Sequence, residues 1–202
     1  MDKIILIGGS PTTGKSYIAR KLAESLKLPW ISTDTVREQM RKLVDKKDYP
    51  KLFVHANANG KTALRYLSEN SAQTIVQNEV NESIEVWQGV KALIETDYVW
   101  GSFIIEGVAV LPSLVKKLSI KNKNIRAVFL IDENIDRVRK TVFTRGLWDN
   151  ANTYPDSIKE KEVAWVLAFN QYLIKEAKKY NLPVIRITDR KKLINQINKL
   201  IK

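Results

Sequence analysis

The sequence predicts a single α/β domain in which helices cover both faces of a parallel β-sheet. Five short apolar runs rich in β-branched residues alternate with longer segments of helical periodicity, which is the pattern of βαβ units. No internal repeat, low-complexity tract or linker divides the chain, so we expect residues 1–202 to form one domain. The strands are expected at 3–8, 28–32, 103–106, 126–131 and 184–187.

The predicted helices follow the 3.6-residue period of apolar side chains. In the first of them, Ile18 and Leu22 recur on one face at helical spacing. In the second, Thr35 and Glu38 stand at the spacing of a capping box, which marks a helix start. The helices are expected at 16–26, 34–44, 63–94 with a break near 70–71, 111–118, 133–145, 157–180 and 191–201.

Two segments lie outside this alternation. Residues 45–98 are long for a connection between strands and predict a helical insertion, and residues 144–158 contain a loop that we interpret as a lid. Ligands of parallel α/β sheets bind beyond the carboxyl ends of the strands. The polar residues that follow each predicted strand are therefore the first candidates for a functional site.

A phosphate-binding loop joins the first predicted strand to the first predicted helix. Residues 9–16 fit the pattern G-x-x-x-x-G-K-[S/T]. Backbone N–H groups of such a loop, together with the N-terminus of the following helix, replace the water around bound phosphate groups. The two fixed glycines allow backbone angles that a side chain would prevent. The pattern therefore predicts a nucleotide site made by Gly9, Ser10, Pro11, Thr12, Thr13, Gly14, Lys15, Ser16 and Tyr17.

The loop also supplies reactive groups. Lys15 provides a cation for the β- and γ-phosphates of ATP, and Ser16 provides a hydroxyl for Mg²⁺. We therefore expect Lys15 to be catalytic, Ser16 to be a metal ligand, and ATP and Mg²⁺ to be the cofactors.

A carboxylate and a guanidinium follow the second predicted strand. Asp34 and Arg37 are three residues apart, so both can point from one side of the helix start. Asp34 can accept or orient the proton of an attacking hydroxyl, and Arg37 can bind an anionic group of the same acceptor. The structural alternative is that Asp34 caps the helix and pairs with Arg37.

Three further residues complete the candidate site. Glu106 ends the third predicted strand, where it can hold Mg²⁺ through water or orient the nucleophile; the structural alternative is that it accepts backbone N–H bonds from the next turn. Gly107 indicates a close backbone approach or a turn with positive φ. We expect Glu106 and Gly107 to contact the acceptor. Arg145, at the edge of the predicted lid, is our candidate for neutralising charge on the transferred phosphoryl group.

Other charged residues are secondary candidates. Lys61 and Arg65, in the predicted insertion, could meet an acceptor anion. Arg137 and Arg139 are expected to be solvated or paired with Glu133 or Asp136, and His55 is expected on the surface.

The composition limits the class of protein. The chain has no cysteine, which excludes disulfides and thiolate metal sites. Its first apolar run is too short for a signal peptide, and no run approaches the roughly 20 apolar residues of a membrane span. We therefore expect a cytoplasmic protein without a membrane partner. The net charge of +12 suits anionic ligands or nucleic acid. We favour a lysine-rich solvated surface, because no aromatic RNA-binding signature accompanies the charge.

Several motifs, in this order, resemble the 2-phosphoglycerate kinase group. They are the phosphate loop, Ile31-Ser32-Thr33-Asp34-Thr35-Val36-Arg37-Glu38, Ile104-Ile105-Glu106-Gly107-Val108, Tyr172-Leu173-Ile174-Lys175-Glu176-Ala177 and Asn181-Leu182-Pro183-Val184-Ile185. The second and third are shared in looser form with shikimate kinase-like and zeta-toxin-like kinases. The chain departs from such kinases at Thr12, where a third loop glycine is usual, and in being shorter than a full-length member.

The resemblance implies a P-loop NTPase fold and a kinase that uses ATP and Mg²⁺. The acceptor would be a hydroxyl of a small anionic metabolite, 2-phosphoglycerate or a similar phosphorylated acid. One alternative is a nucleoside, nucleotide or RNA 5′-hydroxyl kinase, which the basic charge would suit. Another is a nucleotide-dependent switch without phosphotransfer. The pair of Asp34 and Arg37 argues against the switch, because a switch needs no acceptor acid there.

Overall fold

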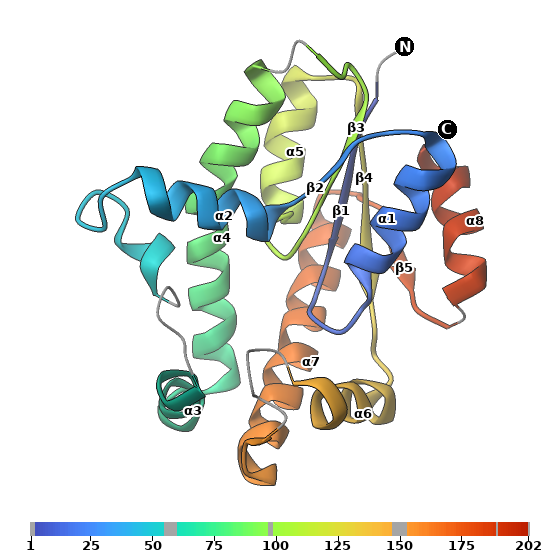
Figure 1. Cartoon of the computed structure of the whole chain (residues 1–202). Helices are drawn as coiled ribbons and strands as arrows, with labels where there is room; N and C mark the ends of the chain where they lie inside the picture. Colours follow the sequence, from blue (N-terminus) through green and yellow to red (C-terminus); the bar gives the residue numbers. More distant parts are fainter. Residues whose placement is uncertain (1–2, 55–59, 97–98, 147–152, 189, 202) are drawn as a thin grey trace.

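A five-stranded parallel sheet forms the centre of the protein. The computed structural model describes residues 3–54, 60–96, 99–146, 153–188 and 190–201. The strands run in the order β2-β3-β1-β4-β5, and every pairing is parallel (Figure 1). They are β1 (Ile4–Gly9), β2 (Trp30–Ser32), β3 (Phe103–Glu106), β4 (Ile125–Ile131) and β5 (Val184–Arg186). The predicted fold class and all five predicted strands are confirmed, with small shifts at their ends.

The helices also lie where their periodicity placed them. They are α1 (Lys15–Leu26), α2 (Thr33–Leu43), α3 (Gly60–Glu69), α4 (Ala72–Thr96), α5 (Pro112–Lys121), α6 (Ile135–Arg145), α7 (Asp156–Lys179) and α8 (Arg190–Ile201). The predicted break near 70–71 is confirmed, because Ser71 accepts a hydrogen bond from the backbone N–H of Thr74 at 3.1 Å and starts α4. A short 3-10 helix, η1 (Pro50–Phe53), lies between the predicted helices 34–44 and 63–94, where we predicted no helix.

The predicted capping box at the start of α2 is wrong. The helix begins at Thr33, and the hydroxyl of Ser32 caps it by accepting a hydrogen bond from the N–H of Asp34 at 3.2 Å. Glu38 is then too far along the helix to cap it, and its carboxylate pairs instead with Arg37 at 3.1 Å and Arg41 at 2.7 Å. The helix therefore starts directly at the end of β2, which brings its first turn to the edge of the sheet.

Both faces of the sheet are buried, and successive side chains of each strand point to opposite faces. In β1, Ile4 and Leu6 join the larger hydrophobic cluster, which includes residues of α4, α5 and α7. Ile5 and Ile7 join the second cluster, with residues of α1 and α8. Figure 1 shows α1 and α8 on one side of the sheet and α4, α5 and α7 on the other. This two-sided burial explains why the strands are continuously apolar in sequence.

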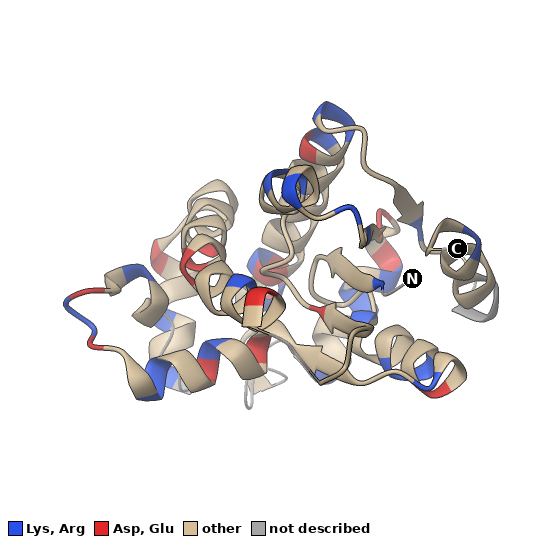
Figure 2. Cartoon of the chain, turned by 90° about the horizontal axis from the view of Figure 1, so that it is seen from above, with Lys and Arg blue, Asp and Glu red and all other residues tan. Residues whose placement is uncertain are grey.

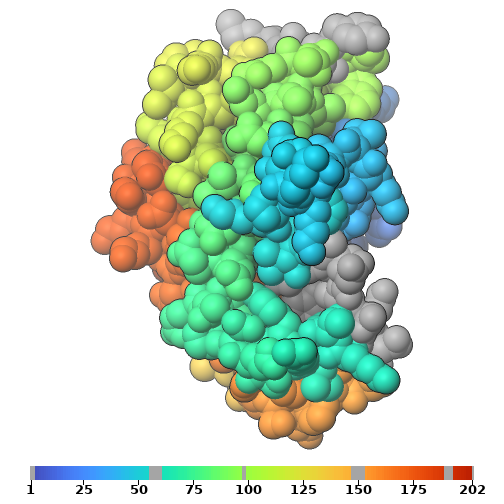
Figure 3. Space-filling model, turned by 90° about the vertical axis from the view of Figure 1, so that its left-hand side faces the viewer, coloured from blue at the N-terminus to red at the C-terminus, as the bar shows by residue number. Residues whose placement is uncertain are grey.

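Helices α2, α3 and α4, which lie between β2 and β3 in the chain, occupy much of the face shown in Figure 3. The Arg41 side chain of α2 is 8% exposed and donates to the carbonyl oxygen of Leu52 at 2.8 Å and to the carboxylate of Glu82 at 2.5 Å. The N–H of Leu52 donates to Glu85 at 2.5 Å. These bonds fasten α2 and η1 to α4. No helix within the described ranges is both long and apolar enough to cross a bilayer.

The long helix α7 carries a buried carboxyl group. The side chain of Glu162 is fully buried, and neither of its carboxylate oxygens has a hydrogen-bond partner in the described part of the chain. Burial raises the pKa of Glu162 to about 7, an effect that the nearby Lys159 only partly offsets. An unpaired carboxylate in such surroundings is destabilising, so Glu162 of the folded protein stays mainly neutral at pH values below about 7.

We expect Glu162→Gln to change how stability depends on pH. The folded-state pKa of Glu162 lies above its ordinary value of 4.5. The contribution of this group to wild-type stability is therefore complete below pH 4.5 and is lost as the pH rises through about 7. The amide cannot ionise, so the variant should melt higher than the wild type at about pH 8, by on the order of 5 °C, and the difference should shrink towards pH 5. Thermal melts at several pH values measure this. Parallel curves for the two proteins would contradict it.

Candidate active site

The phosphate loop connects β1 to α1 with the backbone that its sequence requires. Gly9 has a φ of 153° and Gly14 a φ of 78°. A Cβ at Gly9 would lie 2.6 Å from the carbonyl oxygen of Leu130, so the loop passes too close to β4 for a side chain there. Gly14 precedes α1 as its N-cap, and no side chain caps the helix. The N-terminus of α1 is therefore built to receive an anion.

Lys15 is held inside the loop. Its side chain is 7% exposed, and its ammonium donates to the carbonyl oxygen of Ser10 at 2.8 Å. The hydroxyl of Thr13 donates to the same oxygen at 2.7 Å. Burial lowers the pKa of Lys15, although the carboxylates of Glu106, Asp34 and Glu79 raise it. The result is a desolvated cation that a phosphate group would stabilise.

A buried hydrogen-bond network joins the phosphate loop to α7 and to Asp132, the residue that follows β4. Ser10 donates its hydroxyl proton to Asn170 of α7 at 2.8 Å, and the Asn170 amide donates to the carbonyl oxygen of Asp132 at 2.7 Å. The carboxylate of Asp132 pairs with Arg137 at 2.6 Å, and Arg137 also donates to the carbonyl oxygen of Ile187. The Ser10 side chain therefore holds the loop in place. Arg137 is ion-paired, but with Asp132 and not with the predicted Glu133 or Asp136. Arg139 lies 3.8 Å from the predicted Asp136 and pairs more closely with Glu160, at 2.8 Å.

A pocket of about 400 Å³ lies in front of the loop, at the carboxyl ends of the strands. It brings together eleven of the predicted residues: Pro11, Thr12, Gly14, Lys15, Ser16, Tyr17, Asp34, Arg37, Glu106, Gly107 and Arg145. The other three predicted loop residues, Gly9, Ser10 and Thr13, do not line it.

The two secondary candidates in the predicted insertion are not at this pocket. Lys61 and Arg65 do not line it, and Arg65 pairs with Glu69 along its own helix at 2.8 Å. His55 lies outside the described residues, as does part of the predicted lid, 147–152.

Asp34 and Arg37 form an ion pair at the pocket wall. Arg37 Nη1 lies 3.1 Å from Asp34 Oδ1, and Arg37 Nε donates to Glu38 at 3.1 Å. The pairing part of the structural alternative is therefore present. The capping part is wrong, because Ser32 caps α2. The Asp34 side chain is 60% exposed, so its carboxylate is accessible from the pocket.

Glu106 and Gly107 lie at the base of the pocket. Glu106 is 1% exposed, and its Oε1 has no hydrogen-bond partner among the residues that the structure describes. Burial raises the pKa of Glu106, while Lys15 and hydrogen bonds with Ser16 and Ser32 lower it. Gly107 has a φ of 151°, and a Cβ there would overlap the hydroxyl of Thr33. The predicted close approach of the backbone at Gly107 is confirmed.

Ser16 and Glu106 fit a magnesium ion whose other ligands are phosphate oxygens and water. They do not fit a metal that is held by protein side chains alone. The described residues contain no group of three or more His, Cys, Asp or Glu side chains that could hold a metal. Mg²⁺ in phosphate-transfer sites is bound by phosphate oxygens, water and one or two protein ligands. The unpartnered oxygen of Glu106, beside the Ser16 hydroxyl, matches that donor set.

Four further residues line the pocket that were not predicted from the sequence. They are Glu79 of α4, Thr141 of α6, Trp165 of α7 and Val108. Glu79 is the charged residue of this set, and its carboxylate acts to raise the pKa of both Lys15 and Arg37. The pocket therefore contains three acidic and three basic side chains: Asp34, Glu79, Glu106, Lys15, Arg37 and Arg145.

Thr12 occupies the loop position where a glycine is usual in kinases of the resembled group. Its φ is 71°, in the left-handed region that β-branched residues avoid. Its hydroxyl is buried and has no hydrogen-bond partner in the described part of the chain. The loop therefore closes with a threonine, but in a strained backbone conformation.

We expect Thr12→Gly to be more stable than Thr12→Ala. Both variants remove the unpartnered hydroxyl, but only glycine adopts the left-handed conformation freely. The difference should be roughly 1 kcal/mol, or about 2–4 °C in Tm. Thermal or denaturant unfolding of the pair without nucleotide measures it. Equal stabilities would mean that position 12 is not strained.

No protein-family model matches the sequence. The chain is 29% identical over 184 residues to a protein named 2-phosphoglycerate kinase from Methanocaldococcus jannaschii, covering 90% of this chain and 57% of that protein. It is 32% identical over 190 residues to a 2-phosphoglycerate kinase from Methanococcus maripaludis, covering 90% of this chain and 59% of the relative. The chain thus spans less than two thirds of the length of these relatives.

The fold has counterparts among solved structures. The shikimate kinase from Acinetobacter baumannii, in complex with shikimate, superposes with a TM-score of 0.52 at 13% identity, covering 100% of this chain and 93% of that one. The sequence is therefore similar over most of its length to archaeal 2-phosphoglycerate kinases, and its fold is that of the small P-loop kinases.

Proposed function

We propose that this chain is an ATP-dependent kinase that phosphorylates a hydroxyl group of a small anionic metabolite, 2-phosphoglycerate or a related phosphorylated acid. The observation that carries the proposal is the position of Asp34 and Arg37 in the same pocket as Lys15 and Ser16. One pocket then contains groups for the phosphate donor and groups for an acceptor. The likeness to proteins named 2-phosphoglycerate kinase supports the acceptor class.

The phosphate loop would bind the triphosphate of ATP. The N–H groups at the start of α1 and the Lys15 ammonium face the pocket, and Lys15 would exchange its bond to Ser10 for phosphate oxygens. Ser16 and Glu106 would hold Mg²⁺, which neutralises charge on the β- and γ-phosphates when bound. Arg145 at the pocket edge would add positive charge where the transferred group develops negative charge.

Asp34 would act on the acceptor hydroxyl. The new bond joins the acceptor oxygen to the γ-phosphorus, the bond between the γ-phosphorus and its bridging oxygen breaks, and ADP leaves. The acceptor proton passes to the Asp34 carboxylate. Asp34 is at the second position of α2, where the helix N-terminus stabilises a carboxylate. Its exposure leaves it accessible to a substrate that enters the pocket.

Arg37 would bind an anionic group of the acceptor. The side chain is 26% exposed at the pocket wall and is fixed by Asp34 and Glu38 from its own helix. The six charged side chains of the pocket balance in formal charge, so net side-chain charge alone does not select an anionic acceptor. A directed, planar donor is then the means of recognising one anionic group rather than charge in general.

The size of the pocket and the surface charge favour a small acceptor over an RNA end. The pocket volume of about 400 Å³ is near the lower end of the range for ligand sites. Figure 2 shows Lys and Arg on several helices and interspersed with Asp and Glu in that view. This arrangement supports the interpretation of the net charge as a solvated surface.

We expect Asp34→Asn to lower kcat by about 100-fold and to leave the affinity for a non-hydrolysable ATP analogue nearly unchanged, because the amide cannot take a proton. Steady-state kinetics and analogue titration measure the two effects. Asp136→Asn is a matched control, since Asp136 has the same place in the first turn of α6 and is exposed. If analogue affinity falls as steeply as the rate, Asp34 serves the metal or the fold.

We expect Arg37→Lys to raise KM for the acceptor and to leave KM for ATP unchanged. Lysine keeps the charge but loses the planar fork, so kcat/KM for the acceptor should fall about 10- to 100-fold. Arg20→Lys is the control, because Arg20 is an exposed arginine on α1 that does not line the pocket. An unchanged acceptor KM in Arg37→Lys would exclude bidentate recognition of the acceptor by this residue.

A further inference from the structure

A narrow recess adjoins the pocket beside Arg37. Its wall is formed by α2, α4 and the turn that follows β3, and its volume is about 10 Å³. That is close to the smallest space that holds one water molecule. The recess and the pocket at the phosphate loop have four lining residues in common: Asp34, Arg37, Glu79 and Val108. Five more line the recess alone: Thr33, Glu82, Ser83, Val86 and Ala109.

Ser83 of α4 brings a buried hydroxyl to this recess. The residue is 1% exposed, and its Oγ has no hydrogen-bond partner in the described part of the chain. A helical hydroxyl often donates to the carbonyl oxygen four residues earlier, as Thr96 of the same helix does at 2.7 Å, but Ser83 makes no such bond. A buried hydroxyl without a partner is costly, so a polar group in the recess would stabilise it.

Arg37 also has a donor that its ion pairs do not use. Nη1 pairs with Asp34 at 3.1 Å and Nε pairs with Glu38 at 3.1 Å, so Nη2 takes part in neither ion pair. Two N–H or O–H donors therefore meet at the recess, one from α2 and one from α4.

The charges of the wall favour a neutral occupant. Asp34, Glu79 and Glu82 line the recess with three carboxylates, and the only cation among its lining residues is Arg37. Pairing of Glu82 with Arg41 leaves this set negative by one charge. An anionic oxygen is disfavoured in such surroundings. A water molecule suits them, because it accepts two hydrogen bonds from the donors and gives its own two protons to carboxylates.

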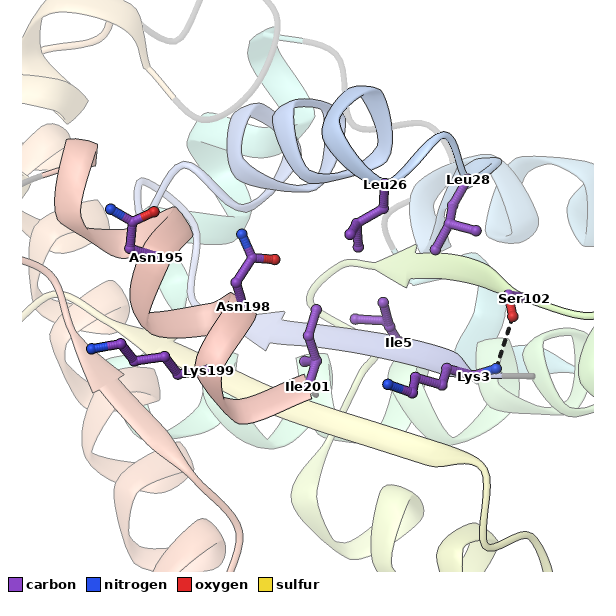
Figure 4. A pocket seen from close by; sticks show the side chains of 9 residues that line it. All are labelled: Lys3, Ile5, Leu26, Leu28, Ser102, Asn195, Asn198, Lys199 and Ile201. Carbon is purple, nitrogen blue, oxygen red and sulfur yellow. Dashed lines mark hydrogen bonds between the residues drawn. The ribbon is translucent and has the colours of Figure 1, made fainter. Parts of the chain in front are cut away.

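A wider cavity at the other end of the sheet does not offer such converging groups among its described lining residues. Its volume is about 740 Å³. Figure 4 shows the Lys199 ammonium and the Asn195 amide directed away from its opening, and Ile5 and Ile201 beneath it are only 1% and 4% exposed. The recess beside Arg37, in contrast, is lined mainly by polar side chains.

We propose that one water molecule in this recess bridges Ser83 to Arg37, and that Ser83 is a positioning residue for the guanidinium. The role of Arg37 at the acceptor rests on the proposed function, in which Asp34 takes up the acceptor proton. A protonated Asp34 holds Arg37 less strongly, because the ion pair loses its charge. The bridge through Ser83 does not depend on that charge, so it keeps the guanidinium in place during the transfer.

The stability of Ser83→Ala without ligands tests the bridge. Alanine has the higher helix propensity, so removing a hydroxyl that binds nothing should raise Tm or leave it unchanged. If the hydroxyl binds a bridging water, the lost hydrogen bonds outweigh that gain, and Tm should fall by about 2–4 °C. A Tm equal to that of the wild type or above it would overturn the proposal.

Kinetics with 2-phosphoglycerate test the positioning role. Ser83→Ala should raise KM for 2-phosphoglycerate about three- to tenfold and leave KM for ATP unchanged. In an Arg37→Lys background the same change should have no further effect, because the guanidinium on which the bridge acts is gone. Ser119→Ala, on α5 and outside both pocket and recess, should behave like the wild type. A full additional loss in the double variant would exclude the positioning role.

A crystal structure of the wild type checks the water directly and needs no variant. We expect one water oxygen within about 3.2 Å of both Ser83 Oγ and a nitrogen of Arg37. A well-resolved recess without that oxygen would contradict the proposal. Failure of the wild type to phosphorylate 2-phosphoglycerate would instead contradict the proposed function, and the Tm of Ser83→Ala and the crystal structure would still decide whether the bridge exists.

Discussion

The hydrogen bonds accepted by the carbonyl oxygen of Ser10 set the geometry on which the site depends. This oxygen binds the buried ammonium of Lys15 at 2.8 Å and the Thr13 hydroxyl at 2.7 Å, so the loop is closed around its own cation. The Ser10 side chain is in turn fixed by Asn170, which also binds the backbone of Asp132 at the end of β4. One loop residue thus connects β1, β4 and α7. The position of the phosphate loop relative to the sheet is determined by buried polar bonds as well as by packing.

Much of the fold could be predicted because its signals are local. The strands are apolar on both faces, so Ile4 to Ile7 identify a buried strand without knowledge of its neighbours. The phosphate loop is equally local, since its glycines, lysine and serine are consecutive. The residues that follow the strand ends, Asp34 and Glu106, could be placed because parallel strands end at one edge of a sheet.

The residues that sequence analysis missed depend on how helices rotate and pack. Glu79 lies near the middle of the segment between β2 and β3, and only the packing of α4 against α2 and α7 turns it towards Lys15. Asn170 is in a long amphipathic helix, and its sequence position gives no sign of the bond to Ser10. The wrong prediction of the N-cap of α2 has a similar cause. Ser32 and Thr35 are both good caps by residue type, and the end of β2 decides between them.

The strand order has a consequence for how the protein is made. The central strand β1 pairs with β3 at residues 103–106 and with β4 at residues 125–130. During synthesis on the ribosome, the first strand therefore emerges about a hundred residues before either partner exists. Until then its apolar side chains have no sheet to join and are open to association with other chains. Because the phosphate loop contacts β4 as well as following β1, nucleotide binding would stabilise the fold only after β4 has been translated.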